Sequence, residues 1–162
     1  TGPSYSHNIT VAQYINTVDD PAALATHGKR YIFSRLQQKN LSMESRLNLL
    51  LSPKMSMQVY TQPLIVVGDY NDYKSLAAPK TFDFDPYLDT VDHPDFNFKS
   101  LRVNAIFRWE WRLGSILYIA WTQQRIDNSD VSNFQLARDS GRVFTGPADN
   151  VFLIKISRWI GK

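Results

Sequence analysis

The sequence predicts an all-β protein, an antiparallel up-and-down sheet of the transmembrane β-barrel type. The first observation is the stretch Lys99–Arg112, in which apolar and polar side chains alternate almost without interruption. Successive side chains of a strand point to opposite faces, so this strand has one apolar face and one charged face. The second observation is the length of the alternating stretches. Several exceed the roughly 5–6 residues typical of strands in soluble sheets, and a strand that spans a membrane needs about 9–11.

The composition fits this fold class and excludes some others. No apolar run approaches the ~20 residues of a membrane helix, and a barrel strand is diluted in hydropathy because half of it faces the lumen. The 162 residues include no cysteine, which excludes disulfides and thiolate metal sites. The net charge of +3 comes from scattered lysines and arginines. This scatter gives a nucleic-acid partner little support.

The first four strands are expected between Asn8 and Val67. The stretch Leu41–Leu51 alternates most regularly, with leucine and methionine against serine, glutamate, arginine and asparagine. Pro63 lacks an amide donor and therefore predicts a bulge or a strand rim. The four strands are Asn8–Val18, Arg30–Gln38, Leu41–Leu51 and Met55–Val67. Their connections are the turns Asp19–Lys29, Lys39-Asn40 and Ser52–Lys54.

Three further strands are expected after a long loop. The loop Gly68–Asp95 carries seven aspartates. The strands are Lys99–Arg112, Ser115–Arg125 and Val151–Ile160, connected by the turn Leu113-Gly114 and the loop Ile126–Asn150. Within the second loop, Ser132–Val143 has the apolar spacing of a short helix, which Gly141 is expected to interrupt.

The connections alternate between the two ends of such a sheet. The two longest, Gly68–Asp95 and Ile126–Asn150, fall at one end together with Lys39-Asn40. Outer-membrane barrels place long loops outside the cell and short turns in the periplasm, as this arrangement does. Seven strands is an odd number, and an open sheet in lipid would leave unpaired edge groups. We therefore expect either a missed strand inside Gly68–Asp95 or a chain that forms part of a larger barrel.

Six charged residues would face the lumen of this barrel. They are Glu44, Arg46, Arg102, Arg108, Glu110 and Arg112. One interpretation is that they select anionic solutes or hold a plug. The interpretation we favour is a cross-strand ladder of charge pairs that stiffens the inner wall. Glu44 and Glu110 are also the two glutamates that a glycoside hydrolase would need, but arginines two residues away would keep both ionised, which suits structure better than acid catalysis.

Two other groups of residues suggest sites. Trp109, Trp111, Trp121 and Trp159 are expected in the aromatic girdle at the membrane interface, with stacking on sugars as the alternative. Asp83, Asp85 and Asp89 are a weak calcium candidate, because Ca²⁺ prefers several carboxylate oxygens. The loop lacks the glycine and closing glutamate of a calcium-binding EF-hand, so a solvated loop is the preferred interpretation. We expect no resident metal and no cofactor.

One segment resembles a known family. Phe96–Arg125 contains an N-x-x-x-R-W-E-x-R-x-G-S pattern that leads into W-T-Q, and the motifs RYIFSRL, LSMESRLN, QVYTQPLIVVGDY and DNVFLIKISRWIGK are similar to the same family. The family comprises large bacterial envelope proteins of unassigned function, with an N-terminal domain like a family-nine carbohydrate-binding module and a C-terminal outer-membrane barrel. Two features depart from the pattern: the N-terminal module is missing, and Arg158 and Gly161-Lys162 replace expected aromatic residues.

The resemblance implies that residues 1–162 are a single barrel domain or the C-terminal segment of a larger barrel. The expected function is non-enzymatic: a channel, a transporter or a membrane anchor for an N-terminal binding domain, located in the bacterial outer membrane. The expected partners are outer-membrane lipid, lipopolysaccharide and the missing barrel strands or other envelope subunits, with no nucleic acid. The alternative is a soluble β-barrel or sandwich that binds an apolar ligand or glycan, with the leucine and tryptophan face turned inward.

Overall fold

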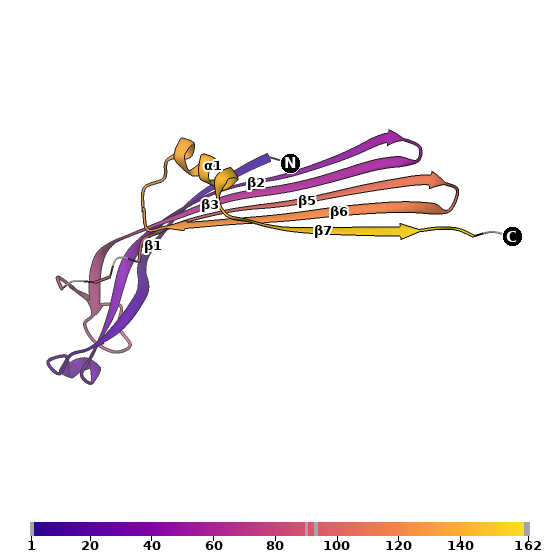
Figure 1. Ribbon diagram of the computed structural model, residues 1–162. Helices are drawn as coiled ribbons and strands as arrows, with labels where there is room; N and C mark the ends of the chain where they lie inside the picture. Colours follow the sequence, from indigo (N-terminus) through magenta and orange to yellow (C-terminus); the bar gives the residue numbers. More distant parts are fainter. Residues whose placement is uncertain (1, 90, 93, 161–162) are drawn as a thin grey trace.

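The computed structural model describes residues 2–89, 91–92 and 94–160 as a seven-stranded, open antiparallel sheet (Figure 1). The strand order is β1-β2-β3-β5-β6-β7, with the short β4 paired to β3 off this path. The strands are β1 (Gly2–Asp19), β2 (Lys29–Ser52), β3 (Met55–Leu76), β4 (Phe84–Pro86), β5 (Phe96–Arg112), β6 (Ser115–Ser129) and β7 (Ala148–Ser157). A 3-10 turn, η1 (Leu24–Thr26), and one helix, α1 (Leu136–Thr145), complete the described elements. The prediction of an all-β, antiparallel, up-and-down sheet is confirmed.

The turn expected at Lys39-Asn40 is absent, because strand β2 runs through it. Lys39 and Asn40 lie inside β2 and pair with both neighbouring strands, so the predicted second and third strands are one strand of 24 residues. Before this point the buried apolar residues of β2 stand at even-numbered positions, and after it most apolar residues stand at odd-numbered positions. Ile32 and Leu36 are buried on one face, whereas the apolar side chains from Leu41 onward point to the other. This change of buried face separates the two alternating stretches without any turn.

Because β2 is one strand, the connections are distributed between the two ends of the sheet differently from the prediction. The turns at 53–54 and 113–114 lie at one end, here called the turn end, near the last residues of β7 (Figure 1). The opposite end, here called the loop end, receives the connections 20–28, 77–95 and 130–147. Asp19–Lys29 therefore lies with the long loops and not, as predicted, with the short turns. All short connections among the described residues are at one end and all long ones at the other.

Strand β3 continues to Leu76, well past its predicted end at Val67, and β4 lies in the segment where a missed strand was considered. Asp72 has a left-handed backbone (φ 57°), and the β2–β3 register shifts beside it. Strand β1 has two further register shifts, between Thr10 and Asn16. Bulges of this kind bend a strand and increase its twist. The loop-end part of β1, β2 and β3 accordingly bends away from the side that carries α1 (Figure 1).

Helix α1 lies over the loop-end part of the sheet. It was expected over Ser132–Val143, and Gly141 was expected to interrupt it; the observed helix starts later, and Gly141 lies inside it. Val143 packs against Ile65, Val67 and Leu101, with Leu41, Val103 and Phe134 around them. No described helix is long and apolar enough to cross a bilayer. The main core is therefore a small layer between α1 and the sheet, Ile32 and Leu36 are buried on the other face in the bent part of the sheet, and neither group extends to the turn end.

Candidate functional site: the two faces of the sheet

The strand register assigns side chains to the two faces of the sheet, because directly paired residues point to the same side. On one face, here called the apolar face, the turn-end half is almost wholly hydrophobic. Its members are Leu47 and Leu49 of β2, Met57 and Val59 of β3, Ala105, Phe107 and Trp109 of β5, Leu117, Ile119 and Trp121 of β6, and Phe152, Ile154 and Ile156 of β7. Helix α1 packs on the same face, but at the loop end. In the described residues nothing covers the turn-end half, where Phe152 and Ile154 are 69% and 66% exposed.

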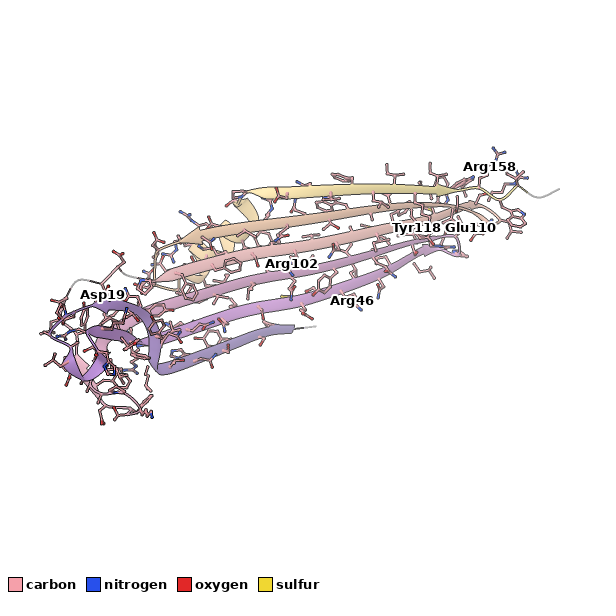
Figure 2. The ribbon with its side chains drawn as sticks, turned by 90° about the horizontal axis from the view of Figure 1, so that it is seen from below. Asp19, Arg46, Arg102, Glu110, Tyr118 and Arg158 are labelled. Atoms are coloured by element: carbon pink, nitrogen blue, oxygen red, sulfur yellow. The ribbon has the colours of Figure 1, made fainter. Side chains whose placement is uncertain are left out.

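The opposite face, here called the polar face, carries five of the six predicted lumen charges. The register places Glu44, Arg46, Arg102, Arg108 and Glu110 there, and Figure 2 looks onto this face. The sixth, Arg112, follows a register shift beside the β5–β6 turn. Amide and hydroxyl side chains take most positions between the charges, and Ile106, Ile116 and Ala120 are apolar residues on the same face. The amide and hydroxyl residues are Asn48, Gln58, Tyr60, Gln62, Asn104, Tyr118, Thr122 and Gln124.

The charged residues of the polar face find different partners from those of the expected ladder. Arg108 Nη2 lies 3.3 Å from Glu110 Oε2, on the same strand. Glu44 Oε1 accepts a hydrogen bond of 3.1 Å from Gln62 Nε2. The Arg46 guanidinium lies over the Tyr60 ring, 5.8 Å from its centre. Across the described ranges no cross-strand ion pair joins these six residues.

The predicted aromatic girdle is partly gathered at one end. Trp109 and Trp111 are in edge-to-face contact with ring centres 6.4 Å apart, and both lie close to the β5–β6 turn. Trp159 joins them at this end, because its backbone N–H donates to Ser115 Oγ at 3.1 Å. Trp121 lies farther along the sheet, stacked on Phe152 at 6.2 Å. Three of the four tryptophans thus share the turn end.

A buried polar network under α1 was missed by the sequence prediction. Lys99 is 1% exposed, and its Nζ lies 3.1 Å from Asp127 Oδ2. Asp139 of α1 is fully buried; it pairs with Arg138 at 2.8 Å and accepts a hydrogen bond of 3.2 Å from Asn97 Nδ2. One signal was available in the sequence. Lys99 occupies an odd-numbered position, as the apolar residues of its strand do, so its side chain points to the apolar face and not to solvent.

A family model described as "Domain of unknown function (DUF5916)" matches residues 4–161, a range that includes nearly all of β1 and every other described strand. This chain belongs to the DUF5916 family. No curated protein and no solved structure matches it. The family match and the fold therefore agree in extent, since the matched range covers the sheet except for the first two residues of β1, and the helix on it.

The DUF5916 chain has an apolar groove between α1 and the sheet. The groove has a volume of about 190 Å³ and opens on the apolar face beside β1, β2 and β3. Leu41, Met43, Pro63, Ile65, Val143 and Phe144 line it, among others. Its position joins the covered part of the apolar face to the uncovered half. Its lining contains no ionisable side chain, and Ser42 and Ser140 are its hydroxyl-bearing members.

The remaining predicted site residues of the DUF5916 chain do not converge. Asp83 and Asp85 flank Phe84 of β4, and no three His, Cys, Asp or Glu side chains in the described ranges lie close enough to hold a metal ion. Glu44 lies in the same cross-strand row as Gln62 and Arg102. Glu110 is eight residues farther along β5 than Arg102. At ~3.4 Å per residue this is roughly 27 Å, far more than the ~5–10 Å between the two carboxylates of a glycosidase.

The network under α1 predicts a pH effect on the helix of the DUF5916 chain. Burial raises the pKa of Asp139, but hydrogen bonds from Arg138, the Gln135 backbone N–H and Asn97 outweigh it, so the pKa is lowered overall. A lowered pKa in the folded state means that this carboxylate stabilises the packed helix above its unfolded pKa of ~3.9, and that the stabilisation is lost as the pH falls through the folded value. We expect amide exchange of α1 to accelerate below about pH 4 relative to the strands.

The Asp139→Asn variant is the matched control for this effect. It keeps the size of the side chain and removes the titrating group, so exchange in α1 should be faster than in the wild type at neutral pH and should lose its acid-dependent step. Hydrogen exchange followed by mass spectrometry measures both. An unchanged acid step in the variant would assign the effect to another group.

Proposed function

We propose that this chain is a segment of a bacterial outer-membrane β-barrel. In this proposal the apolar face contacts lipid, the polar face lines the lumen, and the barrel acts without enzymatic activity as a channel, a transporter or an anchor for a binding domain. The observation that supports it most directly is the uncovered turn-end half of the apolar face. The remaining support comes from the edges of the sheet and from the distribution of its loops.

The uncovered apolar face is difficult to reconcile with water. A sheet in a soluble domain buries its hydrophobic face against a second layer, but α1 covers this face only at the loop end. The apolar row of β5 runs from Leu101 to Trp109, roughly 27 Å along the strand at ~3.4 Å per residue, and the part that α1 leaves uncovered, from Ala105 to Trp109, is roughly 14 Å long. The whole row is of the same order as the ~25 Å lipid-facing band of outer-membrane barrels, and the uncovered part is about half of that band. Lipid is therefore the solvent that fits the exposed surface.

The edges of the sheet indicate further strands. In the described residues, Arg46–Ser52 of β2 has no partner on the β1 side, and β7 pairs with β6 alone. Strand β7 exposes large apolar side chains on both faces, including Val151 and Leu153 on the polar side and Ile156 on the apolar side. An unpaired backbone group in lipid costs several kcal/mol. Strands from the rest of the protein, or from another envelope subunit, would pair with these edges in the proposed barrel.

The loop distribution gives the proposed orientation. Outer-membrane barrels carry short turns on the periplasmic side and long loops on the outside. The turn end would then face the periplasm, with Trp109, Trp111 and Trp159 at the inner interface, where amphipathic rings settle. The loop end, with α1 and the bent part of β1–β3, would face the exterior, where lipopolysaccharide forms the surrounding leaflet. No enzymatic step enters this proposal.

One observation favours the soluble alternative. Helix α1 packs on the apolar face, as a helix covers the hydrophobic face of a sheet in a soluble domain, and an apolar groove lies beside it. In that case the apolar face would be buried and the polar face would contact water. Both proposals keep water from the apolar face, and they differ in what covers it, which is lipid in the barrel and protein in the soluble domain.

Cysteine labelling of β5 distinguishes them, because the chain contains no cysteine of its own. Asn104 points to the polar face, and its neighbour Ala105 points to the apolar face. In both proposals Ala105→Cys is shielded from a water-soluble maleimide, and Asn104→Cys reacts with it. A fluorophore attached to each cysteine separates the proposals. In the barrel, brominated lipid quenches the fluorophore on Ala105→Cys, which lipid contacts, and not the one on Asn104→Cys, whereas in the soluble domain it quenches neither.

Envelope fractionation provides the independent control for this experiment. The full-length protein should remain with the membrane after alkaline washing and should migrate differently in boiled and unboiled gel samples. Recovery of the protein in the soluble fraction, with no heat shift and with Ala105→Cys shielded there, would overturn the membrane proposal and support the soluble alternative.

A further inference from the structure

We propose that the polar face carries a binding site for a small hydroxylated organic anion, centred on Arg102 and Arg46. The inference rests on the proposed function, which makes this face the wall of a lumen through which solutes pass. It specifies the class of solute that the wall recognises. The structural basis is an uneven pairing of charges, in which the acidic groups near the centre are occupied and two arginines are not neutralised.

Arg102 is flanked by neutral residues. Its direct cross-strand partners are Gln62 on β3 and Gln124 on β6. The Gln62 amide is turned to Glu44, to which it donates the 3.1 Å hydrogen bond. In the described part of the chain, no carboxylate lies within 4.0 Å of the Arg102 guanidinium, and no hydrogen bond reaches it. The side chain is exposed on the face that Figure 2 shows.

Arg46 supplies a second cation without a carboxylate partner. It lies two residue positions toward the turn end from Arg102 and two strands away (Figure 2). Strand spacings of ~4.8 Å and a rise of ~3.4 Å per residue put the two Cα atoms roughly 12 Å apart. The Arg46 guanidinium carbon lies 5.8 Å from the centre of the Tyr60 ring, and among the described residues no hydrogen bond or ion pair engages its N–H groups.

An open groove of about 570 Å³ lies beside Arg46. Its lining consists mainly of amide, hydroxyl and charged side chains: Glu44, Arg46, Asn48, Gln58, Tyr60 and Asn104, with Val59 and Ile106. The groove therefore offers neutral donors and acceptors and one aromatic ring next to Arg46, and Arg102 lies outside its lining, two residues along β5 from Asn104. Lys155 of β7 and Asp149 of β7 are the further charges facing this side, both near the far edge of the sheet.

These groups fit one class of solute. A guanidinium binds a carboxylate, phosphate or sulfate through two parallel hydrogen bonds, and arginines in a pore wall favour anions. The amide groups of Gln58 and Asn104 match hydroxyl groups, which both donate and accept. Glu110 is paired with Arg108, and Glu44 is hydrogen-bonded to the neutral Gln62 amide and keeps its charge, so Glu44, Arg46 and Arg102 together carry one net positive charge. A hydroxylated carboxylate satisfies all of these groups together.

Block of ion current by gluconate tests the site. Full-length protein is inserted in planar lipid bilayers, chloride conducts the current, and gluconate is the added hydroxylated carboxylate. Arg102→Gln and Arg46→Gln are each expected to weaken block about tenfold, as expected for loss of one charge-assisted hydrogen-bonded contact. Arg102→Lys keeps the positive charge but cannot form the two parallel hydrogen bonds of a guanidinium, so its block by gluconate should lie between those of the wild type and Arg102→Gln. Lys39→Gln removes the same charge from the opposite face, where Lys39 pairs with Val67, and should leave block unchanged.

The outcomes separate the site from the barrel. Equal block in the wild type and Arg102→Gln, or an inserted protein that conducts no ions, overturns the site and leaves the membrane barrel standing. A wild-type protein that does not insert overturns the barrel, and the site with it. A heat-shifted band for each variant shows that loss of block does not reflect misfolding.

Discussion

Replacing Asp127 with alanine is expected to lower the free energy of unfolding by about 3 kcal/mol, because it leaves a buried lysine without its counter-charge. Lys99 is 1% exposed, and its ammonium group has Asp127 as its close carboxylate partner at 3.1 Å. The neutral acceptors that remain, Asn97 O and Ser129 Oγ, are each 3.2 Å away and offset only part of the loss. Urea unfolding of the full-length protein in detergent micelles, followed by tryptophan fluorescence, measures the change.

The matched variant is Lys99→Met, which removes the other member of the pair. Methionine has a similar shape without the charge, and Asp127 keeps partial exposure and Arg142 at 3.8 Å. Replacing a buried charge by an apolar group of similar volume is often neutral or stabilising, so we expect a change of less than about 1 kcal/mol. A loss in Lys99→Met as large as that in Asp127→Ala would show that the lysine contributes through contacts other than this ion pair.

Replacing Gly68 with alanine is expected to cost about 1–3 kcal/mol, the usual range for overpacking. Gly68 pairs directly with Phe96 across β3 and β5, and the phenylalanine ring lies over the glycine. A Cβ at position 68 would stand 2.2 Å from Phe96 Cε1, so the ring would have to leave its place beside Tyr70, 6.4 Å away between ring centres. Cross-strand cover of a glycine by an aromatic ring is a known means of fixing strand register.

A double-mutant cycle with Phe96→Ala isolates this contact. Without the ring, the new methyl group meets open space, and alanine is the less costly residue for the backbone of a strand. The cost of Gly68→Ala should therefore fall to near zero in the Phe96→Ala background, measured by the same urea unfolding. A cost that persists in that background would point to the backbone at position 68 and not to the ring.

The fold class could be predicted because the strands of this chain keep a strict two-residue period. In Lys99–Arg112 the period assigns faces correctly, as the register of β5 confirms. The same rule was wrong at Lys39-Asn40, because the parity of the buried residues reverses within one strand. The reversal has a tertiary cause: bulges in β1 and β3 bend the sheet beside β2, so that Ile32 and Leu36 are buried on the face opposite to Leu41.

The charges of the candidate site were found from the sequence, and their partners were not. Alternation alone places Arg46 and Arg102 on the polar face, but partners depend on how β2, β3 and β5 align. The observed register sets Gln62 and Gln124 beside Arg102, and a shift of one residue would bring in other neighbours. The network around Lys99 depends on α1, whose docking position is a long-range property. Local patterns therefore predict faces, whereas pairings require the folded sheet.

Strand β7 constrains the order in which this sheet can assemble. Its outer edge presents unpaired N–H and C=O groups, and Phe152, Leu153 and Ile154 are exposed on successive positions. Such an edge in water recruits strands from other copies and promotes aggregation. We expect the chain, if it folded before meeting its neighbouring strands, to polymerise through β7. In the proposed barrel, pairing of this edge should therefore accompany insertion and not follow it, and a carrier that shields β7 during transit would be needed.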